Sequence, residues 1–361
     1  MKILIPETIQ KALAANAPVA IGVSGGKDSC AVALAVDDHL AGYAGPKLLI
    51  HSDLGLVEWK DSARKCEQLA ERLGWELVVV RRAAGGMIER WEQRWKNNLL
   101  RYLNLECVKL ILPWSTPAMR FCTSELKSAV IASELKKRFG GSLTPILSVT
   151  GIRADESAAR AKQPIWKSNP RLERADGTHG YDWHPIHDWS TPQVYEYLQA
   201  QEFELHEAYR VFGSSRVSCA FCIMSSGPDL TAAANCPDNV PAYVRMVALE
   251  ITSTFGFQSS RWLGDVAPAL HGRAVELAAA KAKAEKRQAE EARIPKRLEY
   301  EKGWPTFIPT LGECALIAEV RRNVGAIMGI APLYTTAETV QARYAELFAE
   351  KRSTPNLALA A

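Results

Sequence analysis

The residues best suited to chemistry form the run Ser24-Gly25-Gly26-Lys27-Asp28-Ser29. It follows an apolar stretch at 19–23 that predicts a buried strand, and it precedes residues 30–36, which predict an apolar helix. A helix N-terminus leaves backbone N–H groups unpaired, and glycines let a loop close around an oxyanion. Lys27 adds a positive charge and the serines add hydroxyl donors. This combination predicts a phosphate-binding loop rather than a glycine turn that only joins a strand to a helix.

The loop differs from two commoner phosphate-binding loops. In a Walker loop, Gly-Lys is followed by Ser or Thr, whereas here Asp28 follows Lys27, and Ile21 occupies the position of the first Gly. The Gly-x-Gly-x-x-Gly dinucleotide fingerprint is also absent from this turn. The run instead resembles the PP-loop of the N-type ATP pyrophosphatases. That resemblance implies binding of ATP through its β,γ-pyrophosphate and attack at its α-phosphorus.

Polar residues also follow two other predicted strands. His51-Ser52-Asp53 ends one strand, and Gly151-Ile152-Arg153 follows another, with Arg160 shortly after. Ligands of open parallel sheets bind beyond the carboxyl ends of the strands, and Arg suits bidentate contact with phosphate. We therefore expect anion binding by Arg153 rather than a surface salt bridge. The residues added to the predicted nucleotide site are Asp53, Gly151, Arg153 and Arg160.

A cluster of cysteines indicates a second kind of site. Cys219 and Cys222 form Cys-x-x-Cys, and Cys236 lies 14 residues beyond Cys222. Thiolates at such spacings can reach one metal ion. Cys122 is our choice of fourth ligand, because it starts a predicted helix, where a thiolate is favoured. The preferred interpretation is a [4Fe–4S] cluster; structural zinc and a redox dithiol are the alternatives. The other cysteines are predicted to lie in the core: Cys30, Cys66, Cys107 and Cys314.

The surrounding elements predict the fold class. Strands are expected at 19–23, 47–53, 76–81 and 145–150, alternating with helices, which indicates an α/β fold with a doubly wound, mainly parallel sheet. Residues 161–183 lack periodicity and are predicted to form a long functional loop. We expect a domain at 1–240 that carries the loop and the cysteines, followed by a helical C-terminal region at 241–361.

For two of the predicted helices, the sequence permits more than one role. Residues 87–105 place Trp91 and Trp95 on one face, which is compatible with a packed aromatic face or with a lid or nucleic-acid surface. Residues 268–293 are rich in Ala, Lys and Glu with a weak apolar stripe. A solvated arm is the default expectation for this helix, with a DNA-facing strut or a partner-binding element as alternatives.

Composition bounds the remaining possibilities. The chain has 361 residues, 47% hydrophobic and 23% charged, and its net charge of +4 permits a polyanionic partner without establishing one. The N-terminus lacks a signal-peptide pattern, and no apolar run approaches the ~18 residues that span a bilayer. We therefore expect a cytoplasmic protein without a membrane partner. Eight cysteines in that compartment are expected to be free thiols or metal ligands.

Together, these motifs resemble the phosphoadenosine-phosphosulfate (PAPS) reductase family across roughly residues 15–240. The resemblance implies the adenine nucleotide alpha hydrolase-like fold of the HUP class. The matching stretches occur in this order: the phosphate loop, His51-Ser52-Asp53, Arg120–Lys127, Thr150–Arg160, Pro185–Ser190 and Ser218–Cys222.

Two branches of the family matter. True PAPS reductases have a degenerate PP-loop and end in a Glu-Cys-Gly-Leu-His nucleophile. This chain keeps Lys27-Asp28, and its late Cys314, in Gly-Glu-Cys-Ala-Leu, is a poor match. The chain is more similar to the DndC/SspD-like branch, which acts in DNA phosphorothioation and phage defence. That resemblance implies an ATP pyrophosphatase with a [4Fe–4S] cluster, working on DNA or another nucleic acid.

The same resemblance implies roles for residues and partners. Lys27 and the loop amides would hold the leaving pyrophosphate with Mg²⁺, Asp28 and Asp53 would orient the metal or the loop, and Arg153 would neutralise charge near the reacting phosphate. A cysteine desulfurase would donate sulfur, and other modification-complex subunits are expected. The alternatives are a PAPS- or APS-type reductase, a tRNA-directed PP-loop sulfurtransferase, and a non-catalytic nucleotide-sensing module.

Overall fold

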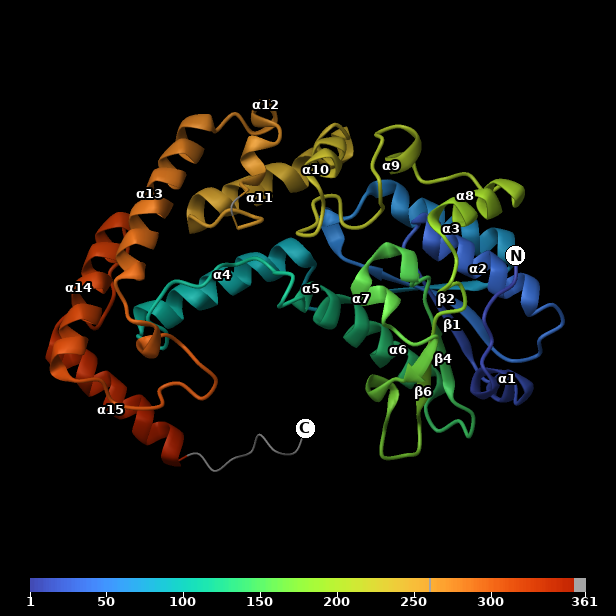
Figure 1. The fold of residues 1–361 in the computed structure, drawn as a ribbon, viewed down its shortest axis with the longest axis horizontal. Coiled ribbons are helices and arrows are strands. Elements are labelled where there is room, and N and C mark those ends of the chain that lie inside the picture. Colours follow the sequence, from blue (N-terminus) through green and yellow to red (C-terminus); the bar gives the residue numbers. More distant parts are fainter. Residues whose placement is uncertain (260, 354–361) are drawn as a thin grey trace. The chain divides into compact units, whose positions relative to one another are not determined.

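The computed structural model describes residues 1–259 and 261–353 (Figure 1). The chain divides into two compact units, which we describe separately. Unit 1 comprises Met1–Glu89 and Ser115–Tyr243, and unit 2 comprises Arg90–Trp114 and Val244–Ala361. The sequence-based division at residue 240 placed residues 90–114 in the first domain, whereas the contacts group them with the C-terminal residues.

Unit 1 is built on one six-stranded sheet in the order β3-β2-β1-β4-β6-β5. Every neighbouring pair is parallel except β5 and β6, which confirms the predicted doubly wound, mainly parallel α/β fold. The strands are β1 (Val19–Val23), β2 (Lys47–Asp53), β3 (Glu76–Arg81), β4 (Ile146–Val149), β5 (Trp166–Ser168) and β6 (Gly180–Trp183).

Two apolar clusters bury the two faces of this sheet. One contains Ile21 of β1 with residues of α1, α2 and α8, and the other contains Ala20 with Leu135 of α6. Adjacent strand residues point to opposite faces, so Ala20 and Ile21 fall in different clusters. The helices of unit 1 are α1 (Glu7–Ala14), α2 (Lys27–His39), α3 (Lys60–Leu73), α5 (Phe121–Thr123), α6 (Ala129–Phe139), α7 (Ala158–Ala161), α8 (Thr191–Ala200), α9 (Glu207–Arg210) and α10 (Gly227–Ala234).

The stretch predicted as a loop, residues 161–183, contains two strands. β6 pairs in parallel with β4, and β5 folds back on β6. Both strands are short, and exposed Lys167 and Ser168 of β5 give no apolar alternation. The strands of this segment therefore form through their pairing with β4 and with each other, and the local sequence pattern does not predict them.

Unit 2 is helical. Its α4 and α11 both begin in unit 1, since the boundaries fall between Glu89 and Arg90 within α4 and between Tyr243 and Val244 within α11. Trp91 packs edge-on against Trp114 and Phe257, with ring centroids 5.3 and 5.9 Å away, which confirms the packed aromatic face rather than a stacking surface. The helices are α4 (Met87–Leu103), α11 (Val240–Ser253), α12 (Pro268–His271), α13 (Ala274–Ala292), α14 (Leu311–Met328) and α15 (Ala337–Ser353).

The helix predicted at 268–293 is interrupted and is not a solvated arm. Gly272 adopts φ +62° and separates α12 from α13. One face of α13 is buried through small alanines and through Arg287, whose guanidinium donates to Glu291 (2.6 Å) and to the Thr254 carbonyl (3.1 Å). Buried charge thus replaces the apolar stripe that the sequence lacks.

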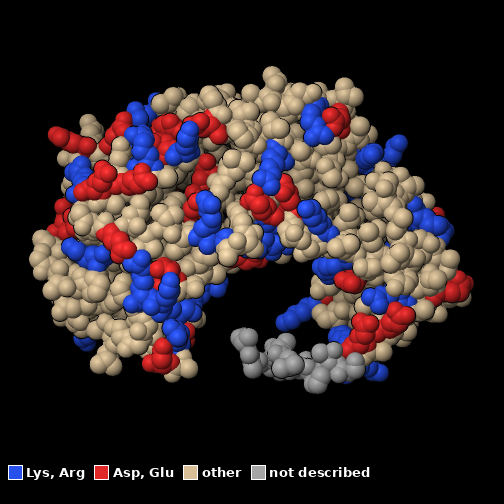
Figure 2. All heavy atoms as spheres, turned by 180° about the vertical axis from the view of Figure 1, so that it is seen from behind, with Lys and Arg blue, Asp and Glu red and all other residues tan. Residues whose placement is uncertain are grey.

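Charged side chains of both signs are interspersed over the face shown in Figure 2. Among the described residues, no helix is both long and apolar enough to cross a membrane.

Candidate active site

The phosphate loop joins β1 to α2 and is closed by its own serines. The Ser24 N–H donates to Ser29 Oγ (3.2 Å), and the Ser29 hydroxyl donates to the Gly26 carbonyl (2.8 Å). Gly25 adopts φ +73°, and a Cβ there would lie 3.0 Å from the Ser62 carbonyl oxygen. Glycine is therefore required at this position, both for the backbone conformation and for the close approach of α3.

Lys27, Asp28 and Arg153 form a chain of contacts at this loop. Lys27 Nζ lies 3.1 Å from Asp28 Oδ2, and Arg153 Nε donates to Asp28 Oδ1 at 2.7 Å. Arg153 is 1% exposed, and its other donors reach the Trp189 carbonyl (3.0 Å), Thr191 Oγ1 (3.1 Å) and Asp155 (3.3 Å). Arg153 therefore acts on the loop through Asp28.

The other predicted nucleotide-site residues have structural partners. A Cβ on Gly151 would lie 2.4 Å from the Asp28 carbonyl oxygen, so this glycine lets the end of β4 pack against the loop. The Asp53 carboxylate accepts from the Gly55 N–H (2.6 Å) and from Arg81 Nε (2.9 Å). Arg160 pairs with Glu156. None of Asp53, Gly151 and Arg160 is among the residues that line the adjoining cavity.

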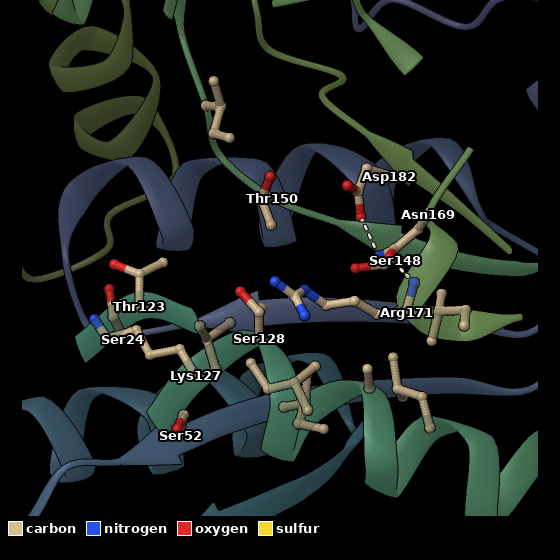
Figure 3. Close-up of a pocket in the computed structure, with 18 of the residues that line it drawn as sticks. Ser24, Ser52, Thr123, Lys127, Ser128, Ser148, Thr150, Asn169, Arg171 and Asp182 are labelled. Carbon is tan, nitrogen blue, oxygen red and sulfur yellow. Dashed lines mark hydrogen bonds between the residues drawn. The ribbon is translucent and has the colours of Figure 1, made fainter. Parts of the chain in front are cut away.

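A cavity of about 380 Å³ opens beside the loop, between the sheet and α6 (Figure 3). Ser24 and Thr123 lie at one end with Lys127, and Asn169 and Asp182 lie at the other. The wall between them is largely apolar: Ile50, Ile131, Leu135, Ile152 and Leu172. An apolar slot with polar groups at both ends suits a flat base joined to phosphate groups.

Lys127 lines the cavity but is not among the predicted site residues, although it ends the family-like stretch Arg120–Lys127. It belongs to a π-helical turn, Ser124–Ser128, and such turns are frequent at functional sites. The Ser52 hydroxyl donates to the Leu126 carbonyl and ties this turn to β2. In Figure 3 the Lys127 side chain extends beside Ser24. The Arg120–Lys127 family stretch was the signal that could have identified it.

The far end of the cavity was missed because it lies on the segment without periodicity. Asn169 donates to Asp182 Oδ1 at 2.7 Å, and burial raises the pKa of the Asp182 carboxyl. Arg171, on the turn between β5 and β6, extends across the cavity in Figure 3, and Lys167 also lines it. These side chains supply hydrogen-bonding groups and positive charge at the end of the cavity opposite Ser24.

Two histidines of the cavity wall differ in protonation. Burial opposes a charge on His51, but its contacts with Cys66 and with Glu58 (Nε2 to Oε2, 3.1 Å) outweigh burial and raise its pKa. Burial lowers the pKa of His184 to about 4, so its imidazole is neutral near pH 7. Thr150 Oγ1 lies 2.9 Å from His184 Nδ1, while Nε2 is buried and has no hydrogen-bond partner among the described residues. That nitrogen can accept or donate one further hydrogen bond.

The predicted metal ligands do not form a metal site. Cys122 and Cys222 act electrostatically on Cys219, whose pKa burial raises to about 12. Cys236 is buried and has Glu207 and Asp238 as its charged neighbours. Across residues 1–259 and 261–353, no group of three or more His, Cys, Asp or Glu is arranged to hold a metal ion. The described residues therefore give no support to the predicted [4Fe–4S] cluster or to zinc.

Comparison with known proteins identifies the family. An uncharacterized 37.8 kDa protein of Escherichia phage 186 is 25% identical over 239 residues, which are 58% of this chain and 68% of the phage protein. PAPS reductase from Candida auris, solved with phosphate, is 16% identical, with 60% of this chain and 88% of that chain covered and a TM-score of 0.37.

A second solved structure, FMN adenylyltransferase from Candida glabrata with FMN and an ATP analogue, is 16% identical. The matched region covers 60% of this chain and 59% of the adenylyltransferase chain, with a TM-score of 0.39. The phosphoadenosine phosphosulfate reductase domain model matches residues 18–224, more than half of the chain. The protein therefore belongs to the phosphoadenosine phosphosulfate reductase domain family.

Proposed function

We propose that the protein is an ATP pyrophosphatase that adenylates an acceptor phosphate in the DNA backbone, so that sulfur can replace one of its oxygens. Family membership indicates an enzyme that uses a nucleotide. The observation that carries the finer proposal is the intact phosphate loop, in which Asp28 pairs with both Lys27 and buried Arg153, and whose Ser24 lines the cavity.

In the proposed reaction, an acceptor phosphate oxygen attacks the α-phosphorus of ATP. A new oxygen–phosphorus bond forms, the bond between the α-phosphorus and the bridging oxygen breaks, and pyrophosphate leaves with the bond electrons. Lys27 and the N–H groups at the start of α2 stabilise charge on the leaving pyrophosphate. Mg²⁺, bound with the triphosphate, would further neutralise that charge.

Adenylation makes the second displacement feasible. A phosphate oxygen is a poor leaving group, whereas AMP departs readily from a mixed anhydride. A sulfide-level sulfur then attacks the acceptor phosphorus and AMP leaves. We propose a cysteine desulfurase together with a thiol reductant as the sulfur source, and other modification-complex subunits as further partners. No step of this scheme requires a metal cluster on the cysteines.

The products of ATP cleavage test the proposal. Incubation with ATP, Mg²⁺, DNA and the sulfur source (a cysteine desulfurase, cysteine and a thiol reductant) should yield AMP and pyrophosphate in equal amounts. ADP with inorganic phosphate would contradict it. Mass spectrometry of DNA from cells with and without the gene should detect phosphorothioate dinucleotides only when the gene is present; their appearance in transfer RNA instead would move the acceptor to RNA.

PAPS reduction is a second candidate, and one observation favours it. Arg171 and Lys167 place positive charge at the cavity end remote from Ser24, where a second phosphate of the nucleotide could bind. Against it, Cys314 is fully buried in α14, where burial raises its pKa to about 11. Thiol-dependent release of sulfite from PAPS, without cleavage of ATP, would support the reductase.

A further inference from the structure

One tyrosine joins the phosphate loop to the cysteine segment, which we define as residues 216–222. Tyr209, in the short helix α9, holds its hydroxyl over the start of α2. The hydroxyl oxygen accepts from the Lys27 N–H (3.4 Å) and from the Val217 N–H (3.1 Å). Val217 lies two residues before Cys219, so a single oxygen contacts both segments.

The base of Tyr209 is firmly anchored. His206 bonds to Ser62 through its Nε2 (3.2 Å), and the Glu207 N–H donates to the Asp61 carboxylate (2.8 Å). Both partners belong to α3, whose residues also pack against the glycine of the loop. Because these anchors fix the start of α9, the Tyr209 hydroxyl has a defined position over the loop.

The hydroxyl occupies a position that a phosphate oxygen would need. Lys27 provides one of the N–H groups at the N-terminus of α2, which are the donors for an anion in this loop. Its 3.4 Å contact with Tyr209 is long for a hydrogen bond, whereas an anionic oxygen forms a shorter and stronger bond to the same donor. Burial raises the pKa of Tyr209, so the hydroxyl is neutral and competes weakly.

We propose that Tyr209 is a positioning residue that couples occupancy of the phosphate loop to the conformation of the cysteine segment. This inference rests on the proposed function only in taking the loop as a pyrophosphate site. When a phosphate oxygen takes the Lys27 N–H, the Tyr209 hydroxyl is displaced, and the Val217 N–H loses its acceptor.

Only the middle of the cysteine segment is freed by this displacement. On its N-terminal side, Ser215 is held by the Asp229 carboxylate through its N–H (2.8 Å) and its hydroxyl (3.0 Å). On its C-terminal side, the Ala220 N–H donates to the Val57 carbonyl (2.8 Å). Between these anchors the Ser214 hydroxyl donates to the Arg216 carbonyl (2.8 Å) and Cys219 forms a β-bridge with Glu58. Release of Val217 between them changes the exposure of the Cys219 side chain without unfolding the segment.

Hydrogen exchange in the wild-type protein tests the coupling without any variant. Magnesium pyrophosphate should slow exchange of amides in residues 24–30 and speed exchange of the Val217 amide. Loss of one hydrogen bond between neutral groups changes an opening equilibrium by about fivefold. Unchanged or slower exchange at Val217 upon binding would overturn the proposal, and so would failure of pyrophosphate to bind.

The variant Tyr209→Phe tests the hydroxyl itself, with Tyr195→Phe as its matched control. Both rings flank Lys27, with centroids 5.7 and 5.9 Å from Nζ, but in the described part of the chain the Tyr195 hydroxyl makes no bond to the loop. Pyrophosphate should change the alkylation rate of Cys219 in the wild type and in Tyr195→Phe, and should leave it unchanged in Tyr209→Phe. A response retained by Tyr209→Phe would contradict the inference.

These measurements separate the inference from the proposed function. Pyrophosphate is added as such, so the coupling can be observed even when ATP is not cleaved. Conversely, AMP formation with no response at Val217 would retain the pyrophosphatase and reject the role of Tyr209.

Discussion

Both units bury arginine side chains, but the partners of those arginines differ. Arg153 in unit 1 is 1% exposed and holds Asp28 of the phosphate loop. Arg321 in unit 2 is fully buried and donates to the carbonyls of Tyr102 (2.8 Å), Tyr334 (2.9 Å) and Leu103 (3.1 Å). The difference shows that burial of a charge does not by itself mark a functional site; the group that it holds does.

Replacement of the loop lysine should produce the largest difference between the units. Lys27→Ala should lower AMP formation about 10²–10³-fold, because it removes a preorganised charge that stabilises the leaving pyrophosphate. Lys281→Ala in unit 2 removes a partly exposed lysine paired with Asp265 and should leave the rate unchanged. Steady-state release of AMP measures both. Equal losses would place nucleotide chemistry outside unit 1.

The buried arginines offer the next contrast. Arg321→Met should lower the free energy of unfolding by about 3 kcal/mol, because buried carbonyls lose their donor. Nucleotide affinity per folded molecule should not change. Arg153→Met should lower both quantities, since it removes the buried partner of Asp28 and leaves that carboxylate with Lys27 alone. Denaturant unfolding and calorimetric titration with a non-hydrolysable ATP analogue measure the two quantities, and a loss of affinity in Arg321→Met would break the contrast.

Two glycines provide a smaller and cleaner comparison. Gly151→Ala should cost about 1–3 kcal/mol of stability and weaken nucleotide binding, because its Cβ would meet backbone atoms of Asp28 at 2.4 and 2.8 Å. Gly312→Ala, in α14, meets no atom within 4 Å and should be neutral or stabilising by less than about 1 kcal/mol. Thermal unfolding of both variants measures the effect, and a neutral Gly151→Ala would show that the loop can shift.

The smallest expected contrast is in pH dependence. Burial lowers the pKa of His184 and of His206 to about 4. Below about pH 6.5 these two histidines therefore bind more protons in the unfolded chain than in the folded one. Unit 1 should lose stability as pH falls from 6.5 towards 4. Burial raises the pKa of Glu250 to about 7, so between pH 7 and pH 4.5 its carboxyl group is protonated more in the folded state than in the unfolded one. Protonation of Glu250 should therefore raise the stability of unit 2 as pH falls through that range.

Hydrogen exchange in each unit at pH 7 and pH 5.5, corrected for intrinsic rates, resolves these opposite trends. Removal of His184 as His184→Gln should reduce the loss of stability in unit 1. A parallel decline of both units in the wild-type protein would contradict the assignment.

The sequence predicted the parts of the fold that local pattern encodes. The apolar runs of β1, β2, β3 and β4 and the glycine loop were identified because buried parallel strands and anion loops have strong local signatures. β5 and β6 were missed because they are short and depend on pairing. The far end of the cavity was missed with them, because Asn169, Arg171 and Asp182 come from that segment.

The burial of charged side chains could not be predicted from the sequence either. Arg287 and Glu291 read as one side of a solvated helix, since nothing in a run of Ala, Lys and Glu shows which charges will find buried partners. The orientation of Arg153 was also beyond sequence: its place after a strand was identified, but its engagement with Asp28 depends on contacts across the fold. The cysteine spacing predicted a metal site, but no group of three or more His, Cys, Asp or Glu among the described residues is arranged to hold a metal ion.

The discontinuity of unit 1 has a practical consequence for truncation. The chain leaves unit 1 at residue 90 and returns to it at residue 115, and within unit 2 both Trp91 and Trp114 pack against Phe257. A fragment that stops at residue 243 would expose these indoles and tend to aggregate. A fragment of unit 1 should instead join residue 89 to residue 115 through a polar linker in place of residues 90–114.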